Sequence, residues 1–287
     1  MEGGGIAFTE PSVGSLGPVT FKCGQCVGCR LLRRQEWTAR IMHEASQHDA
    51  NSFITLTYDD AHLPLHGNLH HADVQRFFKR VRRSGRKFRY YMCGEYGEKF
   101  SRPHYHVCMF GQDFADDRIH FKGAGDHKLY TSETLADLWG EGFAIIGELT
   151  VESAAYVAGY TLKKVTGKQA PQHYETSSIH TGEIIEMKPE YGRMSLKPGI
   201  GATWIDTYAG DCFPHDFCWV RGRKVPIPRY YFDRWKALPD VDSDRIEFER
   251  YLRAAEHASE ATPERLKVRE AVALAKQKAH SRTGVSE

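Results

Sequence analysis

The sequence predicts an α+β fold in which helices pack on an antiparallel sheet. Segments rich in β-branched and aromatic residues alternate along the chain with segments whose apolar residues recur every three or four positions. Two of the strand-like segments, 87–97 and 104–111, are joined by a short polar loop that contains a proline. The two strands of such a hairpin must be antiparallel, so we expect an antiparallel sheet around them.

The first part of the chain is expected to contain two helices and one strand. Residues 1–20 are rich in Gly, Ser and Pro and predict a loop. A helix is expected from the motif CGQCVGCR to about Gln47, because apolar residues there recur at i, i+4 and i+8. SFITLTY, at 52–58, has the alternating β-branched and aromatic residues of a strand. A second helix should begin at Asp73 and end at Ser84, with an apolar stripe on one side.

The second half adds one clear strand and several helices. FAIIGELT, at 143–150, predicts a strand, and 151–165 has helical periodicity, with Thr150 or Ser153 available as a cap. Residues 166–200 are interrupted by Gly and Pro and should form a loop with short strands. From about residue 240 onward the chain is charged and is expected to be helical.

Composition excludes several classes of protein. A chain of 287 residues with 41% hydrophobic residues can bury a substantial core. No apolar run approaches the roughly 18 residues of a membrane span, and the N-terminus lacks the pattern of a signal peptide. We therefore expect a soluble, intracellular protein with no membrane partner. The seven cysteines are an odd number, which argues against a disulfide framework.

Two histidines and a glutamate in the predicted hairpin have the spacing of metal ligands. Alternate side chains of a strand share a face, so His104 and His106 should point to one side and Tyr105 to the other. If the hairpin closes across the 97–102 loop, Glu95 comes close to this pair. Two imidazoles and one carboxylate leave positions open for water or substrate, which suits a catalytic ion. Two ordinary strand histidines are the alternative.

A second group of reactive side chains lies in YVAGYTLKK, within the expected helix at 151–165. Tyr156 and Tyr160 are four residues apart and would share a helix face, which Lys163 and Lys164 roughly continue. A phenol has a reference pKa of about 10 and needs activation, by a metal ion or a lysine, to become a nucleophile. Two tyrosines that only face the core are the alternative.

Cys23, Cys26 and Cys29 have a Cys-x-x-Cys-x-x-Cys spacing that fits a thiolate metal site. A tetrahedral structural Zn²⁺ would need a fourth ligand, which His43 or Cys93 could supply. Reduced thiols without a metal ion and an iron–sulfur cluster are the alternatives.

The net charge is only +2, but basic residues are concentrated in two segments. Residues 76–89 contain no acidic residue, and 221–231 mixes cations with Tyr230 and Tyr231. Cations bind phosphates and aromatic rings stack on bases, so both segments are candidate surfaces for single-stranded DNA. A solvated helix face is the alternative for the first segment. The residues expected to contact DNA are Arg76, Arg80, Arg83, Arg86, Lys87, Arg221, Arg223 and Lys224.

These motifs together resemble a known family. His104-Tyr105-His106 is similar to the histidine–hydrophobic–histidine motif of the HUH endonucleases, and YVAGYTLKK to the two-tyrosine motif of their replication initiators. CGQCVGCR, FITLTYDDAHLP, CGEYGEKFSRPHYHVCMFG and YVAGYTLKK, in this order, resemble the initiators of gokushovirus-like microviruses, which are phages with single-stranded DNA. The resemblance covers about residues 20–235.

The resemblance implies a rolling-circle initiator that nicks origin DNA in the cytoplasm of a bacterial host. One tyrosine would form a 5′-phosphotyrosine and leave a 3′-OH for the host polymerase, and the second would act after one round of synthesis. The partners implied are single-stranded origin DNA and the host helicase and polymerase, and the ion implied is Mg²⁺ or Mn²⁺. By position, the metal ligands would be Glu95, His104 and His106, and the catalytic residues Tyr156, Tyr160, Lys163 and Lys164.

The resemblance also implies a sheet of about five antiparallel strands with flanking helices. It divides the chain into a loop at 1–20, an endonuclease domain with a cysteine-rich N-terminal element at 21–235, and a charged helical extension at 236–287. Gly159 departs from the pattern, since relatives often carry a basic residue before the second tyrosine. Two other functions stay open: a metal-dependent nuclease that uses activated water, and a zinc-stabilised nucleic-acid-binding protein without catalysis.

Overall fold

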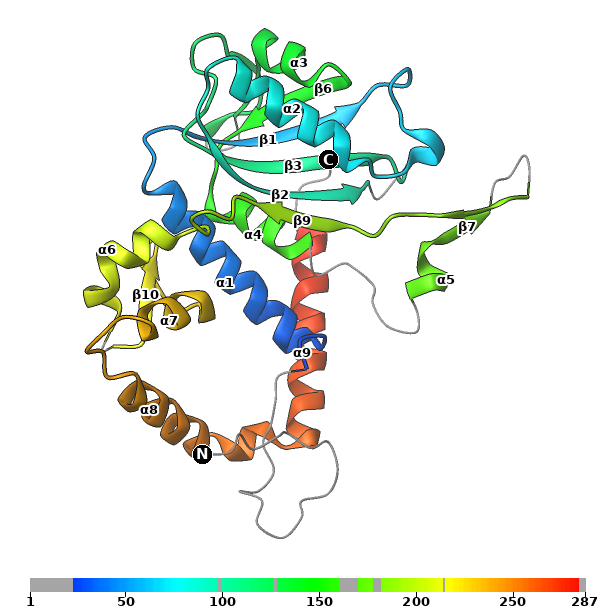
Figure 1. Cartoon of the computed structure of the whole chain (residues 1–287). Helices are drawn as coiled ribbons and strands as arrows, with labels where there is room; N and C mark the ends of the chain where they lie inside the picture. Colours follow the sequence, from blue (N-terminus) through cyan, green and yellow to red (C-terminus); the bar gives the residue numbers. More distant parts are fainter. Residues whose placement is uncertain are drawn as a thin grey trace, which may run out of the picture.

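A seven-stranded antiparallel sheet with helices against both faces forms the centre of the protein (Figure 1). The computed structural model describes residues 23–97, 100–125, 128–160, 170–177, 182–213 and 215–283, without the side chains of Tyr160 and of residues 277–283. The predicted α+β class with an antiparallel sheet is confirmed, and the sheet has more strands than the five or so expected.

The strands of the sheet come from widely separated parts of the sequence. They are β1 (Asn51–Tyr58), β2 (Arg89–Tyr96), β3 (Pro103–Phe110), β4 (Ile119–Lys122), β5 (Leu129–Thr131), β6 (Gly142–Gly147) and β9 (Tyr191–Met194). Their spatial order is β4-β5-β6-β1-β3-β2-β9, so the predicted hairpin of β2 and β3 lies near one edge beside β9. Two separate hairpins pair β7 (Glu175–Ser177) with β8 (Ile184–Glu186), and β10 (Phe217–Val220) with β11 (Arg223–Pro226).

The helices near the N-terminus and after β6 begin close to the predicted positions. The α-helices are α1 (Val27–Ala45), α2 (His71–Arg83), α3 (Glu133–Trp139), α4 (Val151–Tyr160), α5 (Ala170–Tyr174), α6 (Ala202–Cys212), α7 (Arg229–Lys236), α8 (Ser243–Glu256) and α9 (Pro263–Thr283). The expected helical C-terminal extension is confirmed as α8 and α9, whose surfaces are largely exposed. In Figure 1 these two helices project away from the sheet.

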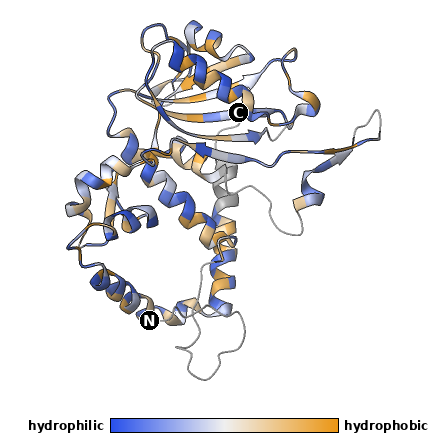
Figure 2. Cartoon of the chain, in the orientation of Figure 1, coloured by the Kyte–Doolittle hydropathy of each residue, from blue (hydrophilic) through white to orange (hydrophobic). Residues whose placement is uncertain are grey.

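Each face of the sheet is buried against different helices. Ile54 and Leu56 of β1 point to the face covered by α2 and α3, where they pack with Phe77 and Trp139 in one core. On the other face, α1 and α4 cover side chains such as Tyr91 of β2 and Phe110 of β3 in a second core. Hydrophobic residues are correspondingly concentrated in the central strands (Figure 2). The sheet therefore separates what lies on α2 from what lies on α4.

Glu44, at the C-terminal end of α1, connects three elements through its buried carboxylate. Its Oε1 accepts hydrogen bonds from Arg89 Nε at 2.5 Å and His48 Nε2 at 3.3 Å, and its Oε2 accepts one from the Gly201 backbone N–H at 2.7 Å. Burial acts to raise the pKa of Glu44, but the hydrogen bonds from His48, Gly201 and Arg89 outweigh it and hold the pKa below the ordinary 4.5. The ionised carboxylate therefore stabilises the fold.

We expect the Glu44→Gln variant to lose about 3 kcal/mol of unfolding free energy, because a buried ion pair loses one partner. Because the folded-state pKa is depressed, the contribution is present above pH 4.5 and is lost as pH falls through the folded-state value. Urea unfolding of the two proteins measures the difference. Glu260→Gln is the matched control, since its ion pair with Arg265 is about half exposed and should contribute less than about 1 kcal/mol. Equal destabilisation by both substitutions would contradict this role for Glu44.

Candidate functional site

Glu95, His104 and His106 lie together on the face of the sheet that α1 and α4 cover. In the register of the hairpin, Glu95 of β2 is opposite His104 of β3, and Cys93 is opposite His106. Tyr105 points to the other face and packs against Trp139, as predicted. The period of two along β3 and the register of the hairpin thus bring the three expected metal ligands together.

The two imidazoles converge on one carboxylate oxygen. His104 Nε2 is 2.7 Å and His106 Nε2 is 2.9 Å from Glu95 Oε1. The other ring nitrogens contact the Arg102 carbonyl at 3.2 Å and the Thr55 hydroxyl at 3.0 Å, which fixes how each ring is oriented. The ligand atoms of the three residues all lie within 4.8 Å of one another.

Glu95 has the environment of a metal ligand. It is 1% exposed, and its Oε2 is buried without a hydrogen-bond partner among the described residues. Burial acts to raise the pKa of Glu95, but hydrogen bonds from His104 and His106 outweigh it and lower the pKa. An unsatisfied buried oxygen costs about 1–3 kcal/mol, a cost that a bound cation would remove. The donor set of two imidazoles and one carboxylate therefore fits a divalent cation.

Tyr156 of α4 places a phenol at these ligands. Its hydroxyl donates a hydrogen bond to Glu95 Oε1 at 3.1 Å, and its ring meets the His106 ring edge-on with centroids 5.1 Å apart. The side chain is 36% exposed, so a substrate can reach it. Tyr160 is the last residue of α4 and lies one turn further on, but its side chain is outside the described set. Lys163 and Lys164 lie outside the described residues.

The position of α4 is set by a cap and by its contact with α1. Thr150 and Ser153 cap its start reciprocally, since each backbone N–H is hydrogen-bonded to the other residue's hydroxyl, at 2.8 and 3.2 Å. Arg34 of α1 donates from Nε to the Ala155 carbonyl at 2.8 Å. A Cβ on Gly159 would lie 3.4 Å from this Nε, so the guanidinium of Arg34 lies directly against the glycine. A cation from α1 therefore neighbours the place where the family pattern often has a basic residue.

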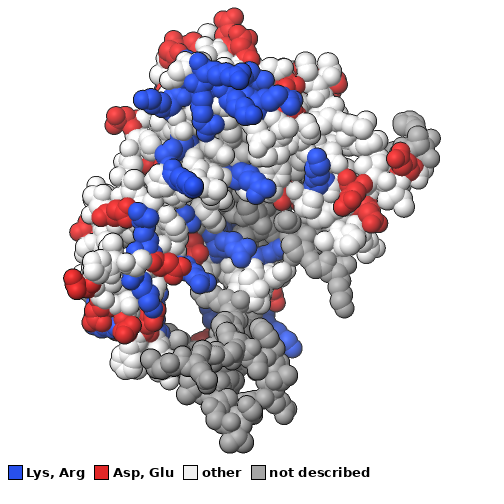
Figure 3. Space-filling model, in the orientation of Figure 1, with Lys and Arg blue, Asp and Glu red and all other residues white. Residues whose placement is uncertain are grey.

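The basic segment at 76–89 lies over the opposite face of the sheet from the histidines. Figure 3 shows its Lys and Arg side chains gathered over α2. Arg76 pairs with Asp73, Arg80 donates to the Leu138 and Trp139 carbonyls, and Arg86 pairs with Asp116. Arg83 and Lys87 make no ion pair within the described part of the chain. Their contact with DNA stays a prediction, and any such contact would lie away from Tyr156.

The second basic segment lies next to α4. Arg221 and Arg223, at the turn between β10 and β11, help to lower the pKa of Glu152 in the first turn of α4, after its own backbone N–H and the Thr150 hydroxyl. Lys224 Nζ lies 4.4 Å from the ring centroid of Phe217 and 5.5 Å from that of Trp219. This hairpin therefore brings cations close to the helix that carries the tyrosines.

The aromatic residues of this segment differ from those expected to stack on bases. Tyr231 is fully buried and its hydroxyl contacts His43 Nδ1 at 3.1 Å, so its expected role at the surface is wrong. The ring of Tyr230 is covered by the Arg40 guanidinium, 3.9 Å from its centroid. Trp219, which is 51% exposed, was missed. The alternation in FCWV, with Cys218 and Val220 buried, is the signal that points Trp219 outward.

The three cysteines of the N-terminal motif lie together, but the expected fourth ligands are elsewhere. His43 is 14 residues beyond Cys29 on α1, or about 21 Å along the helix axis. Both ring nitrogens of His43 are used, by the Tyr231 hydroxyl and the Trp219 carbonyl, and burial lowers its pKa to about 4. Cys93 is buried inside the second core. Both predictions of a fourth ligand are therefore wrong.

No helix within the described ranges is long and apolar enough to cross a membrane.

Known proteins resemble this chain over most of its length. The family model for the replication-associated protein ORF2 matches residues 51–165, which include the metal-ligand group and all of α4. Replication-associated protein VP4 of Bdellovibrio phage phiMH2K is 34% identical over 244 residues, which cover 81% of this chain and 73% of that protein. Replication-associated protein ORF2 of Spiroplasma virus 4 is 32% identical over 74% of this chain and 66% of its own length.

A third relative is replication-associated protein ORF4 of Chlamydia phage 1, which is 27% identical over 77% of this chain and 55% of its own length. No solved structure matches the chain.

Proposed function

This chain belongs to the family of phage replication-associated proteins, and we propose that it initiates rolling-circle replication by nicking and joining single-stranded DNA. One observation carries the proposal: the Tyr156 hydroxyl lies 3.1 Å from Glu95 Oε1, the oxygen that His104 and His106 also contact. A nucleophile and a cation-binding group are thus adjacent, as phosphoryl transfer to a side chain requires.

In the proposed reaction the Tyr156 oxygen attacks phosphorus and the bond from phosphorus to the 3′ oxygen breaks. Glu95 accepts the hydrogen bond from the phenol and is positioned to take its proton. The 3′ oxygen takes up a proton as it leaves, so the products are a 5′-phosphotyrosine and a free 3′-OH. The ester keeps the energy of the broken bond, and attack by a 3′-OH in the reverse sense joins two strands. We assign the second cleavage to Tyr160, with Lys163 and Lys164 as contacts to the phosphate.

Glu95, His104 and His106 would hold Mg²⁺ or Mn²⁺, consistent with the unpaired Oε2 of Glu95. The bound ion would polarise a phosphate oxygen and offset the charge that develops during in-line displacement. Thr55 and the Arg102 carbonyl keep the two imidazoles oriented toward Glu95. The 3′-OH would serve the host replication machinery in the cytoplasm of the infected cell.

The test is detection of a covalent adduct between the protein and DNA. Labelled single-stranded DNA that covers the phage genome is incubated with the full chain in Mn²⁺ or in EDTA, and the products are separated on a denaturing gel. We expect an adduct only with the metal ion, and peptide mass mapping should place it on the segment that contains Tyr156 and Tyr160. Cleavage without an adduct, retained when both tyrosines are Phe, would instead indicate a hydrolytic nuclease that uses activated water.

We also propose that single-stranded DNA approaches α4 along the β10–β11 hairpin, between Trp219 and the cations Arg221, Arg223 and Lys224. The Trp219→Ala variant should bind a labelled single strand about 10-fold more weakly, because stacking on one aromatic ring contributes about 1–3 kcal/mol. Fluorescence anisotropy at fixed salt measures this difference. Tyr251→Ala is the matched control, since Tyr251 is an exposed aromatic residue on α8. Equal losses in both variants would contradict a specific role for Trp219.

A further inference from the structure

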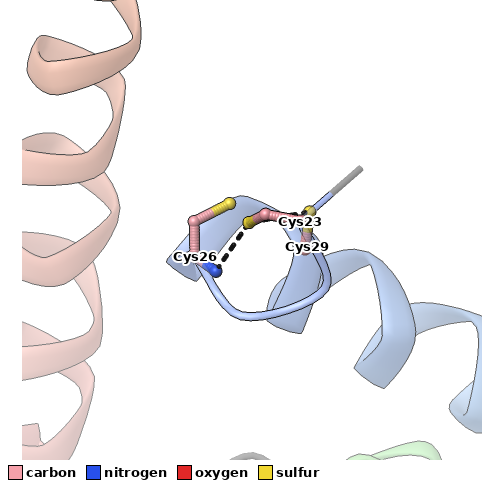
Figure 4. Close-up of side chains that lie close together, drawn as sticks. All are labelled: Cys23, Cys26 and Cys29. Carbon is pink, nitrogen blue, oxygen red and sulfur yellow. Dashed lines mark hydrogen bonds between the residues drawn. The ribbon is translucent and has the colours of Figure 1, made fainter. Parts of the chain in front are cut away.

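The thiols of Cys23, Cys26 and Cys29 form a compact group ahead of and within the first turn of α1 (Figure 4). All three Sγ atoms lie within 4.8 Å of one another, and the Sγ atoms of Cys23 and Cys29 are 4.0 Å apart. Two thiolates bound to one tetrahedral Zn²⁺ at about 2.3 Å would be about 3.8 Å apart. A disulfide would require about 2.05 Å. The observed spacing is that of ligands around a shared ion.

The backbone around Cys23 prepares it to act as a thiolate. Its Sγ accepts hydrogen bonds from the backbone N–H groups of Gln25 at 3.4 Å and Cys26 at 3.2 Å, through a turn in which Gly24 has a φ of +73°. The N–H groups of Cys26 and Gln25 lower the pKa of Cys23 to about 7. A positive φ at a residue other than glycine would be strained, so Gly24 makes this turn accessible.

A cation is needed before all three thiols can ionise together. The backbone N–H of Cys29 acts to lower the pKa of Cys26, but the hydrogen bonds with the Cys23 and Cys29 thiols outweigh it and the pKa is raised. The start of α1 also lacks other negative charge, with no acidic residue in its first turn and no side-chain cap at Cys26. Thiolates at this end would complement the helix dipole, and a bound cation would relieve the repulsion between them.

The other four cysteines behave differently. Cys93, Cys108, Cys212 and Cys218 are buried, and burial raises the pKa of Cys212 to about 11 and of Cys218 to about 12. By contrast, Cys23 and Cys26 are exposed and Cys29 is half-buried, so the three do not act as small hydrophobic residues of a core.

We propose that Cys23, Cys26 and Cys29 bind Zn²⁺ as a structural ion that fastens the chain to the N-terminal end of α1. Thiolate ligands select Zn²⁺ over Mg²⁺ and Mn²⁺, whereas the carboxylate and imidazoles of the Glu95 site accept the harder ions. The three thiolates supply three positions of a tetrahedral site. The guanidinium of Arg33, whose Nη2 would lie 3.4 Å from a Cβ on Gly24, is close enough to offset the net negative charge of the complex.

The experiment measures metal binding directly, so its outcome does not depend on nicking activity. The full chain is purified under reducing conditions without chelator, its zinc content is measured by mass spectrometry, and Co²⁺ is then titrated into the metal-free protein. We expect about one zinc per chain and an intense thiolate-to-cobalt absorption in the near ultraviolet, with visible bands of tetrahedral Co²⁺. In the Cys23→Ser/Cys26→Ser variant, the zinc content should fall at least about tenfold and the absorption should disappear.

Two further variants make the assignment specific. Gln25→Ala changes the same turn without removing a thiol and should keep the zinc, while His104→Ala/His106→Ala should keep the cobalt–thiolate absorption because it alters only the other site. Absence of the absorption from the wild-type chain, or equal zinc content with and without the cysteines, would overturn the proposal. A mass two hydrogens lower, with a Cys23–Cys29 disulfide mapped in the reduced preparation, would overturn it as well.

Discussion

Tyr156→Phe should lower the rate of adduct formation with single-stranded DNA by at least about a thousandfold, because the substitution removes the attacking oxygen. The rest of the site is expected to stay in place, since the Phe ring can keep the edge-on contact with His106. A time course of adduct formation in Mn²⁺, with wild-type and variant proteins at equal concentration, measures the effect. Tyr251→Phe, which changes an exposed tyrosine on α8, is the control.

A second measurement separates loss of the nucleophile from damage to the metal site. The affinity of the Tyr156→Phe variant for Mn²⁺, measured by calorimetry, should remain close to that of the wild type, because the phenol contacts only one oxygen of Glu95. Adduct formation at the wild-type rate through a different tyrosine would show that Tyr156 is not the first nucleophile.

Replacement of Glu95 by Gln should weaken Mn²⁺ binding by at least about 100-fold and abolish metal-dependent cleavage. The substitution removes the charged ligand, which is the strongest attraction for a hard cation, and keeps the size of the side chain. Calorimetric titration with Mn²⁺ and the adduct assay measure the two effects. His62→Gln should leave both unchanged, since His62 is half exposed and pairs with Asp59. Wild-type cleavage by Glu95→Gln would exclude the proposed ligand set.

The hairpin and its ligands were predictable because two local rules decide them. Period-two alternation puts His104 and His106 on one face, and the short 97–102 loop limits the register so that Glu95 meets them. The phenol of Tyr156 could be expected on a helix, but its contact with Glu95 depends on how α4 packs on α1 and the sheet. No local pattern specifies that packing.

Other features depend on tertiary contacts and were missed for that reason. β5 and β9 have three and four residues, too few for periodicity to identify, and they become strands by pairing with β6 and β2. Tyr231 has the composition of a DNA-binding segment around it, yet it is buried against His43. The basic residues of α2 were expected near the chemistry, and only the order of the strands places them on the opposite face.

The contact of Arg34 with Ala155 and Gly159 separates two properties that natural selection can act upon. The ion is held by neighbouring strands, whereas the reach of the nucleophile is set largely by the packing of α4 on α1. Substitutions along this helix pair can shift the phenol relative to the phosphate while the affinity for the ion stays constant. Related phages can therefore diverge in the geometry of strand transfer, and so in the origins they accept, without rebuilding the metal centre.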